Sequence, residues 1–232
     1  VGLTILTDTN TLDTGDILNL NDQGDAGSFT YALDATTFAR TGTGTVTYGT
    51  VETLNLNTSI GAADVDVTTT ADAVNTNITT QDAVDTVDVT DTGTDSNVIV
   101  NTAGEADVIT IADTGGIGAP DAGLAAVGSF LQVNAGDDGD TLTLQDSGAV
   151  SRVELNGEGG TDSINVQASG ALSVTNTNGG ANTDTITLGS AANSLGGILG
   201  DVTVAGDAHD AGTVGLTILT DTNTLDTGDI LN

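Results

Sequence analysis

The sequence predicts an all-β chain that winds as a two-faced parallel β-solenoid, with about 22 residues per coil and loop insertions. Three observations carry this prediction. Apolar residues recur in pairs separated by one polar residue, acidic turns rich in glycine and asparagine precede every second pair, and the last nineteen residues repeat the first nineteen.

The apolar pairs predict the strands. In each apolar–polar–apolar triplet the two apolar side chains share one face and the polar residue points to the other, which is the period of a half-buried strand. Most triplets start eleven positions apart or twice that distance apart, and no segment shows the spacing of an amphipathic helix. The triplets begin at Leu54, Val65, Val87, Val98, Ile109, Leu131, Leu142, Val153, Ile164 and Ile186.

The turns indicate how many strands make one coil. An aspartate stands two positions before the first apolar residue of every second triplet. These aspartates are 22 residues apart, except for one longer step. The strands between these follow turns of a different kind, so two strands and two turns make one coil. The aspartates are Asp85, Asp107, Asp140, Asp162 and Asp184, and the longer step runs from Asp107 to Asp140.

Insertions account for the residues that exceed this period. Long loops are expected near residues 34–44, 112–129 and 189–201, and residues 46–56 read as one long strand interrupted at Gly49. One repeat then holds about 16 strands in eight coils, which at a strand spacing of ~4.8 Å would extend a rod by about 38 Å. The competing interpretation is a pair of immunoglobulin-like sandwiches, which would show irregular strand spacing and hairpin turns.

The exact repetition predicts a tandem array. Residues 1–19 and 214–232 are identical, so position 214 corresponds to position 1. We therefore expect residues 1–213 to form one solenoid repeat unit and residues 214–232 to begin the next. Repeats of this kind are stabilised by contacts with the adjacent repeats, so adjacent copies of the same repeat are the expected partners. Lateral self-association is a further expectation.

Composition limits the functions that the chain can have. The sequence holds 33 acidic residues against two arginines, Arg40 and Arg152, for a formal charge of −31. Such a polyanion repels nucleic acid, and no apolar run is long enough to predict membrane insertion. The lack of cysteine and methionine fits an extracellular or cell-surface location, because little in the chain is easily oxidised.

The acidic turns predict a metal site. Equivalent turns of a solenoid stack about one strand spacing apart, so the turn aspartates should form a column of mutually repelling carboxylates. Ca²⁺ would relieve this repulsion, because it prefers carboxylate and carbonyl oxygens. The alternative is a row of solvated aspartates, chosen for their turn conformation. The candidate ligands are Asp107, Asp137, Asp140, Glu158, Asp162, Asn182 and Asp184.

Two of these turns resemble the glycine-rich nonapeptides of the RTX family. Residues 157–165 match the family pattern at Gly157, Gly160, Asp162 and Ile164, and residues 179–186 match in part. The resemblance implies a parallel β-roll that binds Ca²⁺ in its turns, although the half-coil here has eleven residues rather than nine. The threonine-rich, lysine-free composition also resembles bacterial S-layer proteins and giant secreted adhesins.

Nothing in the sequence predicts catalysis. The single histidine, His209, lies between two aspartates in a turn, and no Ser/His/Asp set, phosphate-binding loop or zinc spacing occurs. We therefore expect a structural tandem-repeat module of a secreted bacterial filament, surface layer or adhesin stalk, stabilised by Ca²⁺, and not an enzyme. The alternative is a Ca²⁺-dependent adhesin module that binds carbohydrate or a surface.

Overall fold

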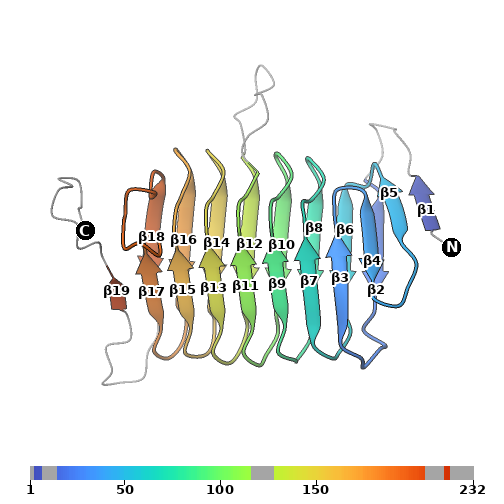
Figure 1. Cartoon of the computed structure of the whole chain (residues 1–232), viewed down its shortest axis with the longest axis horizontal. Helices are drawn as coiled ribbons and strands as arrows, with labels where there is room; N and C mark the ends of the chain where they lie inside the picture. The colour runs from blue at the N-terminus through green and yellow to red at the C-terminus, as the bar shows by residue number, and fades with distance from the viewer. Residues whose placement is uncertain (1–2, 7–14, 116–127, 207–216, 220–232) are drawn as a thin grey trace, which may run out of the picture.

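The computed structural model describes residues 3–6, 15–115, 128–206 and 217–219. In this part of the chain all regular structure is β: nineteen strands form two sheets and no residue is helical. The sheets lie face to face, and the coils stack along the long axis of the molecule (Figure 1). The predicted two-faced parallel β-solenoid is confirmed.

We call the eleven-stranded sheet the long sheet and the eight-stranded sheet the short sheet. The long sheet contains, in spatial order, β1 (Leu3–Leu6), β5 (Val46–Gly49), β4 (Thr37–Arg40), β3 (Phe29–Leu33), β7 (Ala63–Val67), β9 (Thr86–Val89), β11 (Val108–Ile111), β13 (Thr141–Leu144), β15 (Ser163–Val166), β17 (Thr185–Leu188) and β19 (Thr217–Leu219). The short sheet contains β18 (Asp201–Ala205), β16 (Val174–Asn178), β14 (Arg152–Asn156), β12 (Phe130–Asn134), β10 (Asn97–Asn101), β8 (Asn75–Thr79), β6 (Thr53–Asn57) and β2 (Ile17–Asn21).

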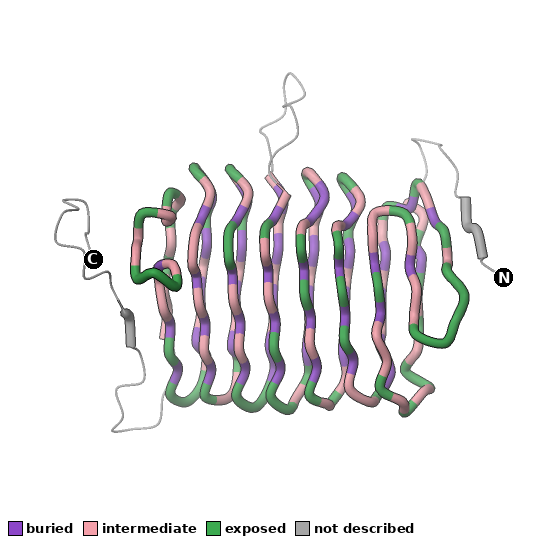
Figure 2. The backbone as a smooth tube through the Cα atoms, viewed as in Figure 1, coloured by how far each residue is buried: buried purple, intermediate pink, exposed green. Residues whose placement is uncertain are grey.

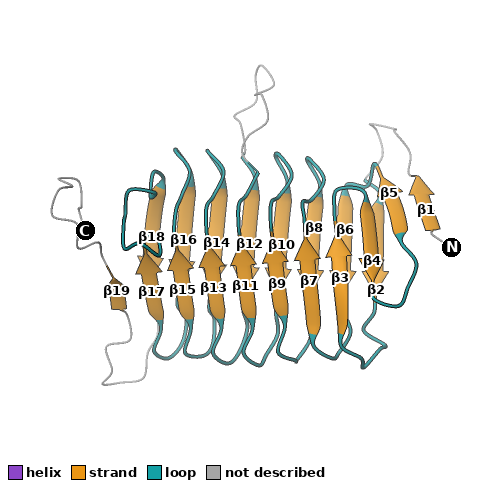
Figure 3. Cartoon of the chain, viewed as in Figure 1, coloured by secondary structure: helices purple, strands orange, loops and turns teal. Residues whose placement is uncertain are grey.

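From β6 to β17 the chain alternates between the sheets at every strand, and each strand pairs in parallel with the next but one. Val65 stands opposite Val87, which confirms the expected length of one coil. Between β11 and β13 the step along the chain is half a coil longer, and Ile109 still stands opposite Leu142. The longer step therefore leaves the register of the coils intact, because its additional residues fall in the sequence between the end of β11 and the start of β12. Figure 3 shows that the described loops lie at the turns between strands.

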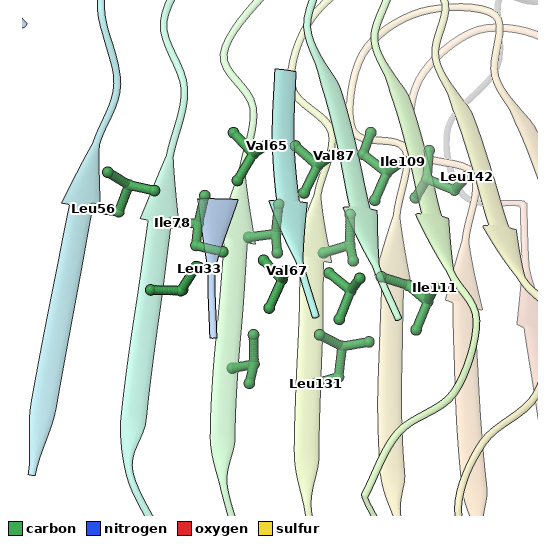
Figure 4. Packing of buried hydrophobic residues seen from close by; sticks show 14 of the residues in the cluster. Leu33, Leu56, Val65, Val67, Ile78, Val87, Ile109, Ile111, Leu131 and Leu142 are labelled. Atoms are coloured by element: carbon green, nitrogen blue, oxygen red, sulfur yellow. The ribbon is translucent and has the colours of Figure 1, made fainter. Parts of the chain in front are cut away.

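Apolar side chains fill the space between the sheets. The two apolar residues of each triplet point inward and stack on their equivalents in the next coil, as Figure 4 shows for Val65, Val87, Ile109 and Leu142. Figure 2 shows the result as alternating buried and more exposed positions along each strand. Each fully buried aliphatic side chain contributes roughly 1.5–3 kcal/mol of burial free energy, so this column of residues is the main source of stability.

The outer face of the short sheet carries ladders of asparagine side chains. Asn55 donates from Nδ2 to Oδ1 of Asn19, and Asn77 donates in the same way to Asn55, both at 2.8 Å. A second ladder runs from Asn156 through Asn134 towards β10. These amides bond coil to coil outside the core, so the sheet is joined by side chains as well as by its backbone.

The N-terminal region differs from the prediction in two ways. Residues 46–56 are not one strand, because β5 belongs to the long sheet and β6 to the short sheet, with a turn at Thr50 where φ is 54°. The predicted loop at residues 34–44 contains β4, so β3, β4 and β5 form an antiparallel meander. Asp34 fixes its first turn by accepting hydrogen bonds from the backbone of Thr36 and Thr37, both at 2.8 Å.

The structure also revises the predicted strand count and supports one of the predicted loops. Residues 1–213 contain eighteen described strands, β1 to β18, rather than about 16, because β4 lies where a loop was expected and β5 and β6 are two strands where one was expected. Residues 189–200 form a loop between β17 and β18, as predicted. Most of the predicted loop at 112–129 lies outside the described residues.

Candidate functional site

The turn aspartates form a buried column along one edge of the solenoid. Each stands directly before a strand of the long sheet, at the turn that enters it from the short sheet. Asp85, Asp107, Asp140, Asp162 and Asp184 are only 1–2 % exposed. Each of them contacts the backbone of the preceding coil, which helps to exclude solvent from the carboxyl group.

One oxygen of each carboxyl group joins two coils. Oδ1 of Asp162 accepts a hydrogen bond from the backbone N–H of Asp140 at 2.8 Å, and Oδ1 of Asp184 accepts from Asp162 at 3.0 Å. The same bond recurs at each step back to Ala63, which donates to Asp85 at 2.6 Å. In each coil the column therefore accepts a hydrogen bond from one backbone N–H of the turn, a group that has no backbone carbonyl as its partner.

The second carboxyl oxygen has no such role. Among the described residues, Oδ2 of Asp140, Asp162 and Asp184 has no hydrogen-bond partner although it is buried. Oδ2 of Asp162 lies over Gly157, and Oδ2 of Asp184 lies over Gly179, where a Cβ atom would collide with it. Glycine at these two positions of the turn is thus needed to make room for the carboxyl group.

Burial raises the pKa of these carboxyl groups. Loss of solvent raises the pKa of Asp107 to about 6, that of Asp140 to about 7 and that of Asp162 to about 6, with the charges of neighbouring acids adding to the effect. The pKa of Asp85 is raised for the same reason. A carboxyl group with such a pKa is partly protonated near neutral pH, so the column carries less charge than its residue count suggests.

The seven predicted metal ligands fall into two sets. Asp107, Asp140, Asp162 and Asp184 lie in the buried column, whereas the other three, Asp137, Glu158 and Asn182, lie exposed on the outside of the same turns. The alternative expectation of solvated aspartates is therefore wrong for the first four.

The two sets do not assemble into a calcium shell. Nowhere in the described parts do three or more histidine, cysteine, aspartate or glutamate side chains come close enough to hold a metal ion. Ca²⁺ takes six to eight oxygen ligands, whereas each coil of the column offers one free carboxyl oxygen. Calcium binding stays a prediction.

The opposite edge of the solenoid has its own ladder, which the sequence analysis missed. At the turns from the long sheet to the short sheet, a threonine or serine hydroxyl accepts a hydrogen bond from a glycine N–H of the next coil, at 2.8 to 3.1 Å. Gly93 bonds to Thr70 in this way, and Gly115 bonds to Thr92. The recurring small–glycine pair at every second turn was the available signal. Side chains thus join successive coils at both edges.

A cluster around Arg40 ties the meander to the first coil. Arg40 lies in β4, where it pairs with Asp22 at 2.9 Å and with Asp25 at 2.6 Å, and its guanidinium lies 3.5 Å from the ring centre of Phe29. Tyr31 donates to Asp22 at 2.6 Å. This role was not predicted, because residues 34–44, which include Arg40, were expected to form a loop. One arginine in a strongly acidic segment was the only signal.

The other arginine lies on the exposed face of the short sheet. Arg152 pairs with Glu154 on the outer face of β14, and its guanidinium lies over the ring of Phe130. His209 and its neighbouring aspartates lie outside the described residues.

The repeated segment pairs with the long sheet at both of its ends. β1 pairs with β5 in parallel, with Ile5 opposite Tyr48, and β19 pairs with β17, with Ile218 opposite Ile186. Ile218 is the counterpart of Ile5 in the second copy of the repeated segment. The repeated segment therefore forms the edge strand at both ends of the long sheet, as β1 next to β5 and as β19 next to β17.

The fold and its laddered turns define a parallel β-solenoid whose coils are joined by side chains at both edges. No protein-family profile, curated protein or solved structure matches the chain. No described segment forms a helix that is long and apolar enough to cross a membrane. The class thus comes from the architecture alone.

Proposed function

We propose that this chain is a structural tandem-repeat module of an extracellular filament, surface layer or adhesin stalk. In this role successive repeats stack into one solenoid, and the module supplies length and stiffness rather than a catalytic site. The observation that carries the proposal is the pairing of one repeated strand at both ends of the long sheet.

The registers at the two ends agree with each other. Ile218 stands opposite Ile186, and its counterpart Ile5 stands opposite Tyr48. Ile186 and Tyr48 are both buried. In an array, one copy of the repeated strand would lie between β17 of one repeat and β5 of the next. On both sides it would then pair in a register that sets the same position opposite a buried residue. Sharing this strand also covers sheet edges that would otherwise invite uncontrolled pairing.

Surface chemistry supports an exposed, mechanical role. The chain has no lysine and two arginines, which leaves trypsin-like proteases few sites. In the described residues most acidic side chains lie outside the strands, and the formal charge of −31 would keep separate filaments soluble. Calcium is retained in the proposal as a stabiliser drawn to the exposed acids Asp137 and Glu158, with its own test given below.

A protein with two consecutive repeats tests the proposal directly. If the repeats share a strand, they should melt in one transition, at a higher temperature than a single repeat, because each covers an edge of the other. Ile218→Pro should uncouple them, since proline removes a ladder N–H from a central strand. Ile5→Pro is the matched control, because it makes the same change in the same strand at the outer end.

Three outcomes would contradict the proposal. Independent melting of the two repeats in the unmodified protein would show that no strand is shared. Equal effects of the two proline substitutions on the coupling would show that the junction does not depend on β19. Saturable binding to glycans that requires Ca²⁺ would favour the adhesin alternative.

A further inference from the structure

The two sheets advance by different numbers of strands in each repeat. The long sheet has eleven described strands, but β1 and β19 are the same segment of two successive repeats, so each repeat contributes ten. The described part of the short sheet contributes eight. A straight solenoid needs equal numbers, because every coil adds one strand to each face.

The difference comes from one insertion. From β1 to β19 the chain visits the sheets alternately, except that β3, β4 and β5 all lie in the long sheet. β4 and β5 stand between β3 and β1, and their antiparallel pairing marks them as a hairpin inserted into one face only. Figure 1 shows β1 and β5 at this end of the molecule, tilted against the row of stacked strands.

We infer that consecutive repeats meet at a fixed bend, with the long sheet on the outer side of the curve and the short sheet on the inner side. Two extra strands at ~4.8 Å lengthen one face by about 10 Å per repeat, and packed sheets lie about 10 Å apart. If the bend absorbs the whole difference, its angle is roughly one radian, or about 55°. The inference rests on the proposed stacking of repeats.

Large side chains fill the wedge that the hairpin creates. Four of the five aromatic residues lie on β3, β4 and β5, and the rings of Tyr31 and Phe38 stack with their centres 6.3 Å apart. Phe38 and Tyr48 lie on the inserted strands and are only 8 % and 4 % exposed. The hydroxyl of Tyr48 donates to the backbone oxygen of Asp34. A wedge packed in this way holds one angle and does not act as a hinge.

The Arg40 cluster fixes the hairpin to the first coil. Its ion pairs with Asp22 and Asp25 reach from β4 to the turn between β2 and β3, so the inserted strands cannot slide along the sheet without breaking them. An array of such repeats would be a curved or superhelical filament with roughly six to seven repeats per turn at the full angle.

Electron microscopy of the two-repeat protein tests the inference. Class averages should show two straight segments meeting at one angle of several tens of degrees, with a narrow distribution. In the second repeat, residues 34–52 can be replaced by residues 68–74, which connect β7 to β8 without extra strands. This change equalises the two faces at the junction and should straighten the particle. The same replacement in the first repeat lies away from the junction and should leave the angle unchanged.

The outcomes separate the two proposals. A straight, rigid particle from the unmodified protein would overturn the bend and leave the stacking of repeats intact. Two segments with a broad range of angles would show that the repeats do not stack, and would overturn the proposed function. If the replacement prevents folding, the angle in the unmodified protein still decides, and an angle that survives replacement in a folded second repeat overturns the role of the hairpin.

Discussion

Replacing Asp162 by asparagine should change how the stability of the solenoid depends on pH. Asparagine keeps the Oδ1 acceptor that receives the N–H of Asp140, but it cannot ionise. Burial raises the pKa of Asp162 from 3.8 to about 6, which corresponds to roughly 3 kcal/mol at about 1.4 kcal/mol per pKa unit. This figure is the largest difference in unfolding free energy that ionisation of this group can produce.

The direction of the effect follows from the raised pKa. Below pH ~4 the carboxyl group is protonated in both the folded and the unfolded chain, so it costs nothing. Between pH ~4 and about 6 the carboxyl group ionises in the unfolded chain but stays protonated in the folded chain, so the wild type loses stability over this interval, and above it both states are ionised and the loss stays constant. Asp162→Asn removes this loss, so the variant should gain up to about 3 kcal/mol relative to wild type between pH 4 and pH 8.

Urea unfolding followed by circular dichroism at several pH values measures this difference. Placing an amide group in the column also changes the unfolding free energy by an amount that does not depend on pH. This amount cancels when the difference between variant and wild type at pH 4 is subtracted from the difference at pH 8. Asp137→Asn removes an acid from the exposed side of an equivalent turn and serves as the control, with the wild-type pH dependence expected. Parallel stability curves for Asp162→Asn and wild type would refute the argument, since they would show that burial in the column imposes no penalty on the charge.

Three further changes test other parts of the structure. Gly157→Ala should lower the unfolding free energy by about 1–3 kcal/mol in urea, because its Cβ would collide with Oδ2 of Asp162. Gly104→Ala is the control and should have a smaller effect, since a Cβ there meets nothing closer than 3.7 Å. Equal effects of the two substitutions would be inconsistent with crowding at Gly157. Val150→Gly should raise stability by about 1 kcal/mol, since Val150 has a φ of 64° that a β-branched residue adopts poorly, and a lower melting temperature would count against this. Ca²⁺ at millimolar concentration should raise the melting temperature more than NaCl of equal ionic strength, and EDTA should reverse the effect; identical curves in the two salts would reject the calcium prediction.

The strands of the coil region could be predicted because their signal is local. Val87 and Val89, with one polar residue between them, predict a strand whose apolar side chains face inward, whichever strand it pairs with. The interval from Val65 to Val87 gives the coil length directly. The hairpin could not be predicted in the same way. Val46 and Tyr48 alternate like any other strand, and nothing near them indicates which sheet they join or that β4 pairs antiparallel.

The candidate site was predicted in position but not in environment. An aspartate in a turn rich in glycine and asparagine is normally solvated, so Asp162 reads as an exposed residue. Its burial depends on the coils stacked above and below, which bring Asp140 and Asp184 within hydrogen-bonding distance from a full coil away in the chain. Asp137 precedes Asp140 by three residues and yet is exposed, so near neighbours in this turn differ in burial in a way that the sequence does not indicate.

The aspartate column also determines how the molecule should release protons as the solution becomes more alkaline. Asp140 lies between Asp107 and Asp162, and the negative charges of these two neighbours raise its pKa, so a proton lost from one of the three makes the next loss harder. Asp107, Asp140 and Asp162 therefore do not share a single midpoint, and they lose their protons gradually between weakly acidic and neutral pH. A longer array would carry more of these groups without sharpening the transition, so its stability should fall by degrees as the pH rises from weakly acidic to neutral.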